Sequence, residues 1–402
     1  MTFTEFKLDE RLSEGIEAMH YQTATPIQKQ VIPAIIEGKD IIASAQTGTG
    51  KTAAFLLPLI HKLITSPHDA NNINAMIIVP TRELAIQIGK TLEGLSYFTP
   101  ISSISVYGGN DGVMFTAEKK ALSTGVDIVI CTPGRMIAHL NMGYVKLDGL
   151  KYLVLDEADR MLDMGFNEDI MKIISYLPKQ RQTLLFSATM PIKIREMARR
   201  ILREPLEINI AISKPPEKIL QQAFIVYETQ KVCLVKHVLH QKAFNSVLIF
   251  CTKKQNVKQL SKTLKGHRFS VEEIHSDLEQ DKREQVLLDF KNKKLKILVA
   301  TDILSRGIDI EDIDLVINYD VPRDNEDYIH RIGRTARASS NGTAYTFVTE
   351  KEQREFSKIE KLLGHSVMKA AVPEHFGAVP VYNPRSHTAQ RKKYYGRTRQ
   401  VR

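Results

Sequence analysis

The feature that most constrains the fold is an alternation of short apolar runs with stretches of helical periodicity, which continues through both halves of the chain. Apolar runs without polar alternation are typical of strands whose two sheet faces are both covered by helices. In a β-α-β succession of this kind the strands are parallel and the sheet is doubly wound. We therefore expect an α/β fold with two tandem doubly wound parallel-sheet domains.

The expected strands are the runs richest in apolar and β-branched residues. In the first half they are 41–44, 76–79, 104–107, 127–131, 152–155 and 183–186, and in the second half 247–250, 271–274, 297–300, 315–317 and 343–347. Polar residues follow directly after many of these runs. Open α/β sheets bind ligands at the carboxyl edge of their strands, so these polar segments are the candidate sites.

Length and composition indicate a globular protein of more than one domain. The chain has 402 residues, of which 43% are hydrophobic and 25% charged. The N-terminus lacks the apolar core of a secretory signal, and no apolar run approaches membrane-spanning length. The three scattered cysteines fit a reducing compartment and form no disulfide framework or zinc site. We expect a cytoplasmic protein with no membrane partner.

The net charge of +10 is concentrated at the C-terminus. After Glu374 the chain carries seven basic residues, no acidic residue, and three tyrosines. Such a basic tail suits a polyanion such as RNA, through phosphate attraction and base stacking. The alternative is a solvated terminus that only aids solubility.

A glycine-containing loop follows the first expected strand. Residues 45–52 read Ala-Gln-Thr-Gly-Thr-Gly-Lys-Thr, and a helix is expected to begin near Gly50. Glycines let backbone N–H groups surround phosphate oxygens, and the helix directs its positive end at the anion. Lys51 can reach β- and γ-phosphates, and the Thr52 hydroxyl can bind Mg²⁺. The loop therefore predicts a nucleoside triphosphate site, although Ala45 replaces the usual first glycine.

Two acids, Asp156 and Glu157, follow the strand expected at 152–155. Acids that can hold a magnesium ion and a water complete the minimum requirement for hydrolysing a nucleoside triphosphate. Asp156 is predicted to hold Mg²⁺ through water, and Glu157 to act as base for the attacking water or to position it. Two acids alone could simply end a strand at the surface, but Lys51 favours the catalytic interpretation.

The tetrad Asp156-Glu157-Ala158-Asp159 gives its name to the DEAD-box ATP-dependent RNA helicases, and the sequence resembles this family over about residues 3–365. The resemblance rests on a series of motifs in the family's order rather than on the tetrad alone. The other motifs are 25–28, 45–52, 80–85, 108–109, 132–135, 187–189, 248–251, 275–283, 300–309 and 330–337. The run 334–338 is similar to the bacterial RhlE-type branch of the family.

The resemblance implies RecA-like domains that face each other across a cleft. It places an ATP-binding domain at 1–208, with the adenine-reading Q motif at 3–28, a linker at 209–218, a second domain at 219–365 and a basic, disordered tail at 366–402. A site that hydrogen-bonds one base rejects another, so the motif implies ATP rather than GTP. The residues implied to bind ATP are Phe3, Gln28, Ala45, Gln46, Thr47, Gly48, Thr49, Gly50, Lys51, Thr52 and Asp309.

Catalysis is implied to draw on both domains. Lys51, Asp156 and Glu157 belong to the first domain, and Thr52 and Asp156 would hold the metal. Arg334 and Arg337 resemble the family's arginine fingers, which stabilise charge on the transferring phosphoryl group. The alternative for these arginines is a surface cluster that binds RNA phosphates directly. Ser187, Thr189 and His330 are implied to couple the ATP side to the RNA side.

RNA is implied to contact both domains through its sugar–phosphate backbone, which fixes position and carries little base sequence. The residues carried over for this role are Pro80, Thr81, Arg82, Gly109, Thr132, Gly134, Arg135, Thr301, Arg306 and Gly307.

The motifs together predict RNA-stimulated ATP hydrolysis coupled to local, non-processive unwinding or remodelling of RNA duplexes and RNA–protein complexes. The expected partners are structured or duplex RNA and ribonucleoprotein or RNA-decay proteins, with ATP and Mg²⁺ as cofactors and a monomeric chain. The alternatives are an ATP-gated RNA clamp or assembly scaffold with incidental unwinding, and a DNA translocase of related design. A small-molecule P-loop kinase would leave the second half of the chain unexplained.

Overall fold

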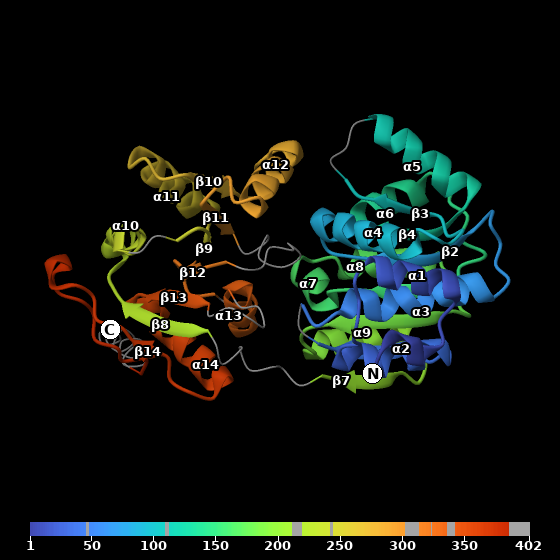
Figure 1. The fold of residues 1–402 in the computed structure, drawn as a ribbon, viewed down its shortest axis with the longest axis horizontal. Helices are drawn as coiled ribbons and strands as arrows, with labels where there is room; N and C mark the ends of the chain where they lie inside the picture. Colours follow the sequence, from blue (N-terminus) through green and yellow to red (C-terminus); the bar gives the residue numbers. More distant parts are fainter. Residues whose placement is uncertain are drawn as a thin grey trace, which may run out of the picture. The chain divides into compact units, whose positions relative to one another are not determined.

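A computed structural model of the chain describes residues 1–45, 48–108, 112–210, 219–241, 244–301, 313–322, 324–335 and 342–385. The chain divides into two compact units, Met1–Ser213 (unit 1) and Lys214–Arg402 (unit 2). Each unit contains a 7-stranded sheet whose neighbouring strands are all parallel. The predicted α/β class with two doubly wound parallel sheets is confirmed (Figure 1).

The sheet of unit 1 has the strand order β3-β4-β2-β5-β6-β1-β7. Its strands are β1 (Ile41–Ser44), β2 (Ile73–Ile78), β3 (Ser103–Val106), β4 (Val126–Cys131), β5 (Tyr152–Leu155), β6 (Gln182–Ser187) and β7 (Leu206–Asn209). Its helices are α1 (Glu10–Ala18), α2 (Pro26–Ile36), α3 (Lys51–Thr65), α4 (Arg82–Ser96), α5 (Gly112–Thr124), α6 (Pro133–Asn141), α7 (Ala158–Asp163), α8 (Asn167–Ser175) and α9 (Ile192–Ile201).

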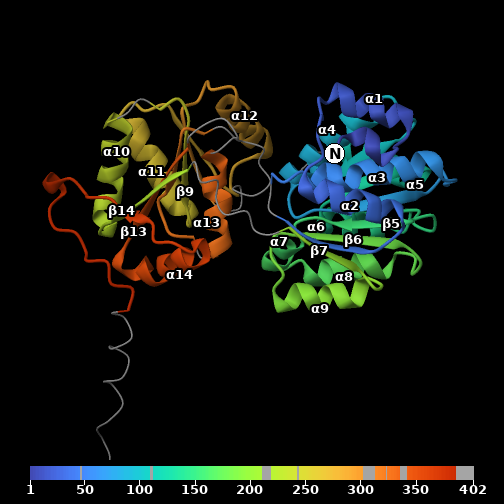
Figure 2. The ribbon, with the colours of Figure 1, turned by 60° about the horizontal axis from the view of Figure 1, so that its bottom comes forward.

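Helices cover both faces of this sheet because alternate strand residues point to opposite sides. In β2, Ala75 and Ile77 pack with residues of α1, α2, α3 and α4, whereas Met76 and Ile78 pack with α6, α8 and α9. Figure 2 shows α2 and α3 on one side of β6 and α8 and α9 on the other. Residues on both faces are fully buried, which explains why the strands lack polar alternation.

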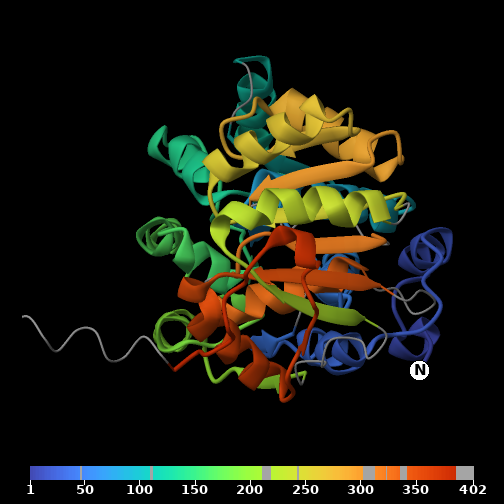
Figure 3. The ribbon, with the colours of Figure 1, turned by 90° about the vertical axis from the view of Figure 1, so that its left-hand side faces the viewer.

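The sheet of unit 2 has the order β10-β11-β9-β12-β13-β8-β14. Its strands are β8 (Leu220–Ile225), β9 (Val247–Cys251), β10 (Val271–Ile274), β11 (Ile297–Thr301), β12 (Leu315–Asn318), β13 (Thr343–Val348) and β14 (Met368–Lys369). Its helices are α10 (Lys231–Gln241), α11 (Lys254–Gly266), α12 (Gln280–Lys291), α13 (Asn325–Ile332) and α14 (Gln353–Leu363). Helices α10 and α11 cover one face, seen in front of the strands in Figure 3, and α12, α13 and α14 cover the other.

Three strands were not predicted: β7, β8 and β14. The first half of β8 carries Gln221 and Gln222, which interrupt the apolar run, and β14 has only two residues. Strand β7 is buried only at Ile208 and exposed at its other three positions, because it lies at the sheet edge, next to β1. Short or polar edge strands lack the continuous apolar pattern on which the prediction depended.

The region expected to be a disordered tail from residue 366 is partly ordered. Strand β14 pairs with β8, and Gln353 binds the segment further on, donating from Nε2 to Val381 O (2.9 Å). Tyr382 donates its hydroxyl to Glu360 Oε2 (2.6 Å). Strand β8 and helix α14 thus hold residues 366–383 in place within unit 2. The prediction missed these contacts because the partner residues are distant in the sequence. Residues 386–402, which hold most of the basic residues of the predicted tail, lie outside the described residues.

None of the helices in the described part of the chain combines the length and apolarity that a membrane span needs. This agrees with the absence of a long apolar run in the sequence.

Candidate nucleotide and RNA site

The strand order of unit 1 places the candidate residues in two groups along one edge of the sheet. All strands are parallel, so the segments that follow them emerge at the same edge. The candidate nucleotide segments follow β5, β6 and β1, which are consecutive in the sheet. The candidate RNA segments follow β3, β4 and β2, which are also consecutive. Two neighbouring groups of loops thus correspond to the two predicted ligands.

The phosphate loop has the backbone conformation that its glycines permit. Gly48 has φ +79° and Gly50 has φ +90°, values that residues with a Cβ rarely adopt. Gly50 is the N-cap of α3, and Lys51 and Thr52 form the first turn of that helix. The exposed N–H groups of a helix N-terminus favour an anion at this point. Gln46 and Thr47 lie outside the described residues.

Lys51 is a buried cation without a hydrogen-bond partner among the described residues. The residue is only 6% exposed, and its charge lowers the pKa of the buried Asp156 carboxyl. A buried ammonium without a partner is costly unless a ligand satisfies it. The residues present therefore fit a phosphate group, and Asp156 with the Thr52 hydroxyl supplies the hard oxygen ligands that Mg²⁺ prefers.

Asp156 ends β5 in a buried position. Burial raises the pKa of Asp156 to about 6, although Lys51 acts in the opposite direction. Its Oδ1 accepts a hydrogen bond from the N–H of Glu157 (2.9 Å), which fixes the carboxyl orientation. A carboxylate held in this way benefits from an added positive charge, as a magnesium ion would supply.

Glu157 is held both by its backbone and by Arg160. The residue has φ +51°, an uncommon left-handed conformation outside glycine, and its side chain is buried. Arg160 donates from a terminal guanidinium nitrogen to Glu157 Oε2 (3.2 Å). Strained backbone of this kind is often retained at functional sites. The sequence predicted a role for Glu157 but not this partner.

Asp159 connects the tetrad to the end of β6. Its Oδ2 accepts hydrogen bonds from the N–H groups of Ala188 (3.1 Å) and Thr189 (2.9 Å). Ser187 in turn donates its hydroxyl to Thr189 O (2.7 Å). The predicted coupling residues Ser187 and Thr189 are therefore tied to the acids after β5. No local sequence pattern indicates this link, because β5 and β6 become neighbours only in the sheet.

Gln28 connects the Q motif to the phosphate loop. Its Nε2 donates to Gly50 O (3.1 Å), and its Oε1 accepts from the N–H of Thr25 (2.8 Å). A Cβ added to Gly50 would lie 2.5 Å from Gln28 Nε2, so the contact requires glycine. The side-chain oxygen and nitrogen of Gln28 can each form one further hydrogen bond, which leaves room for an adenine contact. That contact stays a prediction.

Phe3 lies in the main apolar core of unit 1. Its ring centroid is 6.0 Å from that of Phe6 and 6.1 Å from that of Tyr21, and the side chain is buried. Phe3 therefore packs in the apolar core of unit 1 together with residues of the Q motif. Its stacking on adenine stays a prediction.

The candidate RNA residues lie at helix starts. Thr81 is the N-cap of α4 and accepts from the N–H of Leu84 (3.4 Å), and Thr132 is the N-cap of α6. Pro80 is buried, Arg82 begins α4, and Gly134 is exposed with open space around its Cα. Helix N-termini suit phosphate groups. Gly109 lies outside the described residues.

Arg135 is engaged within the protein. Its Nε donates to Glu118 Oε2 (2.8 Å), and its guanidinium lies 4.7 Å from the ring centroid of Phe115. His139 stacks on the same ring with a centroid distance of 4.6 Å and contacts Glu118. These contacts join α5 to α6, so Arg135 has a packing role that the sequence did not reveal.

Unit 2 contributes fewer described candidates. Thr301 ends β11, with a buried hydroxyl that has no hydrogen-bond partner among the described residues. His330 lies in α13, and Arg334 lies in the 3-10 turn Gly333–Thr335 that follows; both side chains are buried. The remaining candidates of this unit, Arg306, Gly307, Asp309 and Arg337, lie outside the described residues.

The fold and the site define a class: a protein with two doubly wound parallel-sheet units, one of which carries a phosphate loop and acids at its carboxyl edge. Comparison with protein families places residues 25–197 in the DEAD/DEAH box helicase family and residues 230–339 in the helicase conserved C-terminal domain. The chain belongs to the DEAD-box family of ATP-dependent RNA helicases.

Relatives and solved structures agree with this family. The ATP-dependent RNA helicase CshA of Listeria monocytogenes is 45% identical over 87% of this chain and 66% of its own length. The CshA of Limosilactobacillus reuteri is 43% identical over 90% of this chain and 72% of its own length. These two relatives therefore extend beyond the matched part.

The structures of S. cerevisiae Dbp5 bound to RNA and ADP BeF3, and of Mss116p bound to ssRNA and AMP-PNP, both superpose with a TM-score of 0.82. The first is 30% identical and covers 92% of this chain and 95% of its own; the second is 31% identical and covers 94% and 81%. The tandem RecA-like architecture is thereby confirmed.

Proposed function

We propose that the chain hydrolyses ATP in response to RNA and uses the cycle for local, non-processive unwinding or remodelling of RNA duplexes and RNA–protein complexes. The observation that carries this proposal is the buried ammonium of Lys51, which lies beside Asp156 and has no hydrogen-bond partner among the described residues. Lys51 lies at the carboxyl edge of the sheet, and other loops at the same edge contain the candidate RNA contacts. Similar proteins have been solved with RNA and with nucleotide analogues, which supports both ligands.

Within unit 1 each residue would have a distinct part. Lys51 and the N-terminus of α3 bind the β- and γ-phosphates, Gln28 and Phe3 select the adenine, and Asp156 and Thr52 hold Mg²⁺. A bound magnesium ion supplies charge neutralisation at the phosphates. Glu157 orients the attacking water and accepts its proton.

Unit 2 would complete the site when both ligands are present. ATP and RNA each favour closed units, so binding of one strengthens binding of the other. Closure would bring Arg334 and Arg337 to the γ-phosphate and Thr301, Arg306 and Gly307 to the RNA backbone. The Asp159 link to Ser187 and Thr189, together with His330, would couple nucleotide state to RNA grip. Phosphate release then reopens the units.

The first test compares ATP turnover with single-stranded RNA, with DNA of the same sequence and without polynucleotide. We expect RNA to raise kcat by at least about tenfold, because charge stabilisation by unit 2 depends on closure. Turnover that is equally fast without polynucleotide would contradict the proposal. Displacement of a short duplex, compared with residence time on single strands, then separates unwinding from an ATP-gated clamp.

The basic tail is the second testable part of this proposal. Deleting residues 386–402 removes six basic residues and no acid, and spares the segment that packs on α14. We expect weaker RNA binding and a log–log salt slope that is shallower by up to about 4 for single strands, because counterion release falls with each lost contact. RNA-saturated ATPase should not change.

Binding titrations at several salt concentrations would measure this slope. A matched control replaces the same six basic residues with glutamine and keeps Tyr394 and Tyr395. If charge carries the effect, both variants lose the same slope. An unchanged slope in the deletion would leave the tail as a solubilising terminus. The cytoplasmic location and monomeric state remain part of this proposal.

A further inference from the structure

Unit 2 repeats the strand order of unit 1, which allows equivalent places to be compared. The sixth strand is β1 in unit 1 and β8 in unit 2, and the fourth is β5 and β12. The helix after β1 begins with Lys51, and the helix after β8 begins with Lys231. Asp156 follows β5 and Asp320 follows β12. The same pair of residue types therefore stands at the same two places of each sheet.

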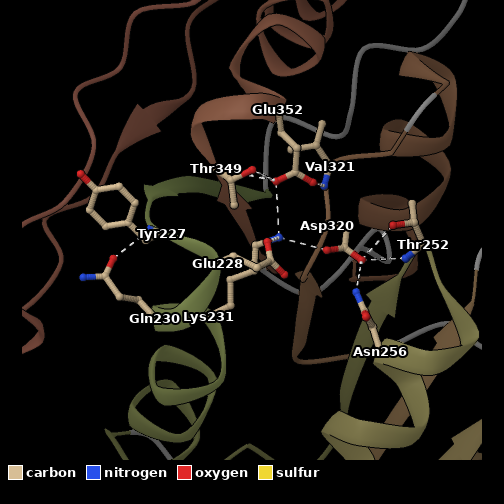
Figure 4. Close-up of polar contacts among 10 residues, drawn as sticks. All are labelled: Tyr227, Glu228, Gln230, Lys231, Thr252, Asn256, Asp320, Val321, Thr349 and Glu352. Atoms are coloured by element: carbon tan, nitrogen blue, oxygen red, sulfur yellow. Dashed lines mark hydrogen bonds and ion pairs between the residues drawn. The ribbon is translucent and has the colours of Figure 1, made fainter.

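The two lysines differ in the groups that pair with their side-chain nitrogens. Lys51 Nζ has no hydrogen-bond partner among the described residues. Lys231 Nζ binds Asp320 Oδ1 (3.0 Å), Glu352 Oε2 (3.4 Å) and Glu228 Oε2 (3.1 Å), as Figure 4 shows. Its side chain is 1% exposed. The protein's own carboxylates thus pair with Lys231, whereas phosphate is the proposed partner of Lys51.

The charges of this cluster are stable at neutral pH. Burial tends to lower the pKa of Lys231, but Glu352 and Asp320 outweigh it, so the pKa lies above its ordinary value. Burial tends to raise the pKa of Asp320, but Lys231 and hydrogen bonds from Thr252 bring it below its ordinary value. Asp156 also has a nearby lysine and one backbone hydrogen bond, but burial outweighs both and its pKa is shifted in the opposite direction.

The cluster fixes the backbone that follows β12. Asp320 Oδ2 accepts from the N–H (2.9 Å) and hydroxyl (2.8 Å) of Thr252 after β9. Glu352 Oε1 accepts from the N–H of Val321 (3.1 Å), and its Oε2 accepts from the Thr349 hydroxyl (2.6 Å). The ends of β9, β12 and β13 are therefore joined around one ammonium group.

The same backbone is attached to α13, the helix before Arg334. Arg331 is fully buried and donates from one guanidinium nitrogen to Asn318 Oδ1 (3.1 Å) and to Asp320 O (3.0 Å). Arg334 lies in the turn that continues α13, and its carbonyl accepts from the N–H of Ile313 (3.2 Å). A continuous series of contacts thus runs from Lys231 to the turn that carries Arg334.

We infer that Lys231, with Asp320 and Glu352, forms a self-filled counterpart of the phosphate site and acts as the positioning residue for Arg334. The inference rests on the proposed function of Arg334 in ATP hydrolysis. A site filled by its own carboxylates takes no nucleotide, so unit 2 serves the ATP bound by unit 1. The ammonium of Lys231 fixes the backbone after β12, which through Arg331 positions α13 and the turn that carries Arg334.

The test is a double-mutant cycle in the full chain, with RNA-saturated kcat as the first measurement. Lys231→Met should lower kcat by about tenfold, the scale expected for a residue that acts through another. Arg334→Ala should lower it by about a thousandfold. The double variant should match Arg334→Ala alone, because a positioning residue has no effect once its target is gone. Affinity for a fluorescent ADP analogue should remain within about twofold of wild type in all variants, since ADP lacks the γ-phosphate.

Lys265→Met is the matched control. Lys265 pairs with Glu272 at the surface of the same unit, and its loss should leave kcat unchanged. Thermal unfolding of each variant separates positioning from loss of the fold. If Lys231→Met does not fold because the buried Asp320 and the partly exposed Glu352 lose their partner, K231M/D320N provides a neutral pair with the same expected loss of kcat.

Three results would overturn the inference: a folded variant with wild-type kcat, a loss that adds in full to that of Arg334→Ala, or failure of both cluster variants to fold. The last would make the cluster a folding element alone. If Arg334→Ala itself keeps wild-type turnover, the proposed role of Arg334 in ATP hydrolysis is wrong. The Arg334→Ala single variant thus distinguishes failure of the proposed function from failure of the inference about Lys231.

Discussion

Replacing Lys51 with alanine is expected to reduce RNA-stimulated ATP turnover by about 100- to 1,000-fold. The Lys51 ammonium is buried, has no hydrogen-bond partner among the described residues, and stands at the start of α3 beside Asp156. Its removal takes a fixed positive charge from the place where phosphate charge develops. Because Lys51 lowers the pKa of Asp156, the variant should also shift that pKa further above about 6.

Phosphate-release kinetics at saturating RNA and magnesium would measure this loss. Lys62→Met is the control: Lys62 lies on the same helix at the opposite end and donates to backbone carbonyls of α2. It should retain turnover, although its stability can fall with the loss of those bonds. RNA binding by Lys51→Ala without nucleotide should stay near wild type. Retained turnover in Lys51→Ala would remove the phosphate-loop assignment.

Glu157→Gln is expected to lower kcat by about 100- to 10,000-fold while ATP and RNA stay bound. Glutamine has nearly the same shape and can still accept the hydrogen bond from Arg160, so the side chain keeps its place. What is lost is the carboxylate that accepts the proton of the attacking water. The closed state then persists because neither ligand is released without hydrolysis.

The measurement is the dissociation rate of labelled RNA after ATP is added and competitor RNA is supplied. Glu168→Gln is the matched control, since Glu168 is an exposed carboxylate on α8 of the same unit and should release RNA like wild type. Rapid release of both ligands from Glu157→Gln would count against the role of Glu157 as base. Slow hydrolysis combined with slow release is the expected pattern.

The difference between Lys51 and Lys231 shows how one fold can serve two purposes. Both lysines begin the helix after the sixth strand of a 7-stranded parallel sheet. In unit 1 the Lys51 ammonium has no hydrogen-bond partner among the described residues, whereas in unit 2 three carboxylates pair with Lys231. A buried charge is tolerated only when an opposite charge pairs with it. A partner supplied by a ligand makes the position a binding site, whereas a partner supplied by the protein makes it a structural contact.

Several roles became visible only through long-range contacts. Gln28 meets Gly50 across 22 residues, and Asp159 meets Thr189 across 30. Arg135, expected to contact RNA, also holds Glu118 and Phe115. The ordered part of the C-terminal region is attached by Gln353 and Tyr382, which no local pattern indicated.

Local sequence patterns were enough to predict the fold class, the central strands, the candidate phosphate loop and the acids after β5. Each of these depends on local information: apolar runs fix buried strands, glycines permit the positive φ of the loop, and a motif places its residues on one short turn. The family followed from the order of such motifs along the chain.

The tertiary structure alone decided which of these segments are neighbours. Strand order places the candidate nucleotide loops after β5, β6 and β1 and the candidate RNA loops after β3, β4 and β2, an order that differs from that of the chain. It also gives Lys231 three carboxylate partners, while Lys51 has no hydrogen-bond partner in the described part of the chain. The physical reason is that hydrogen bonds and ion pairs depend on distances in space, which chain-distant residues acquire only when the sheet has formed.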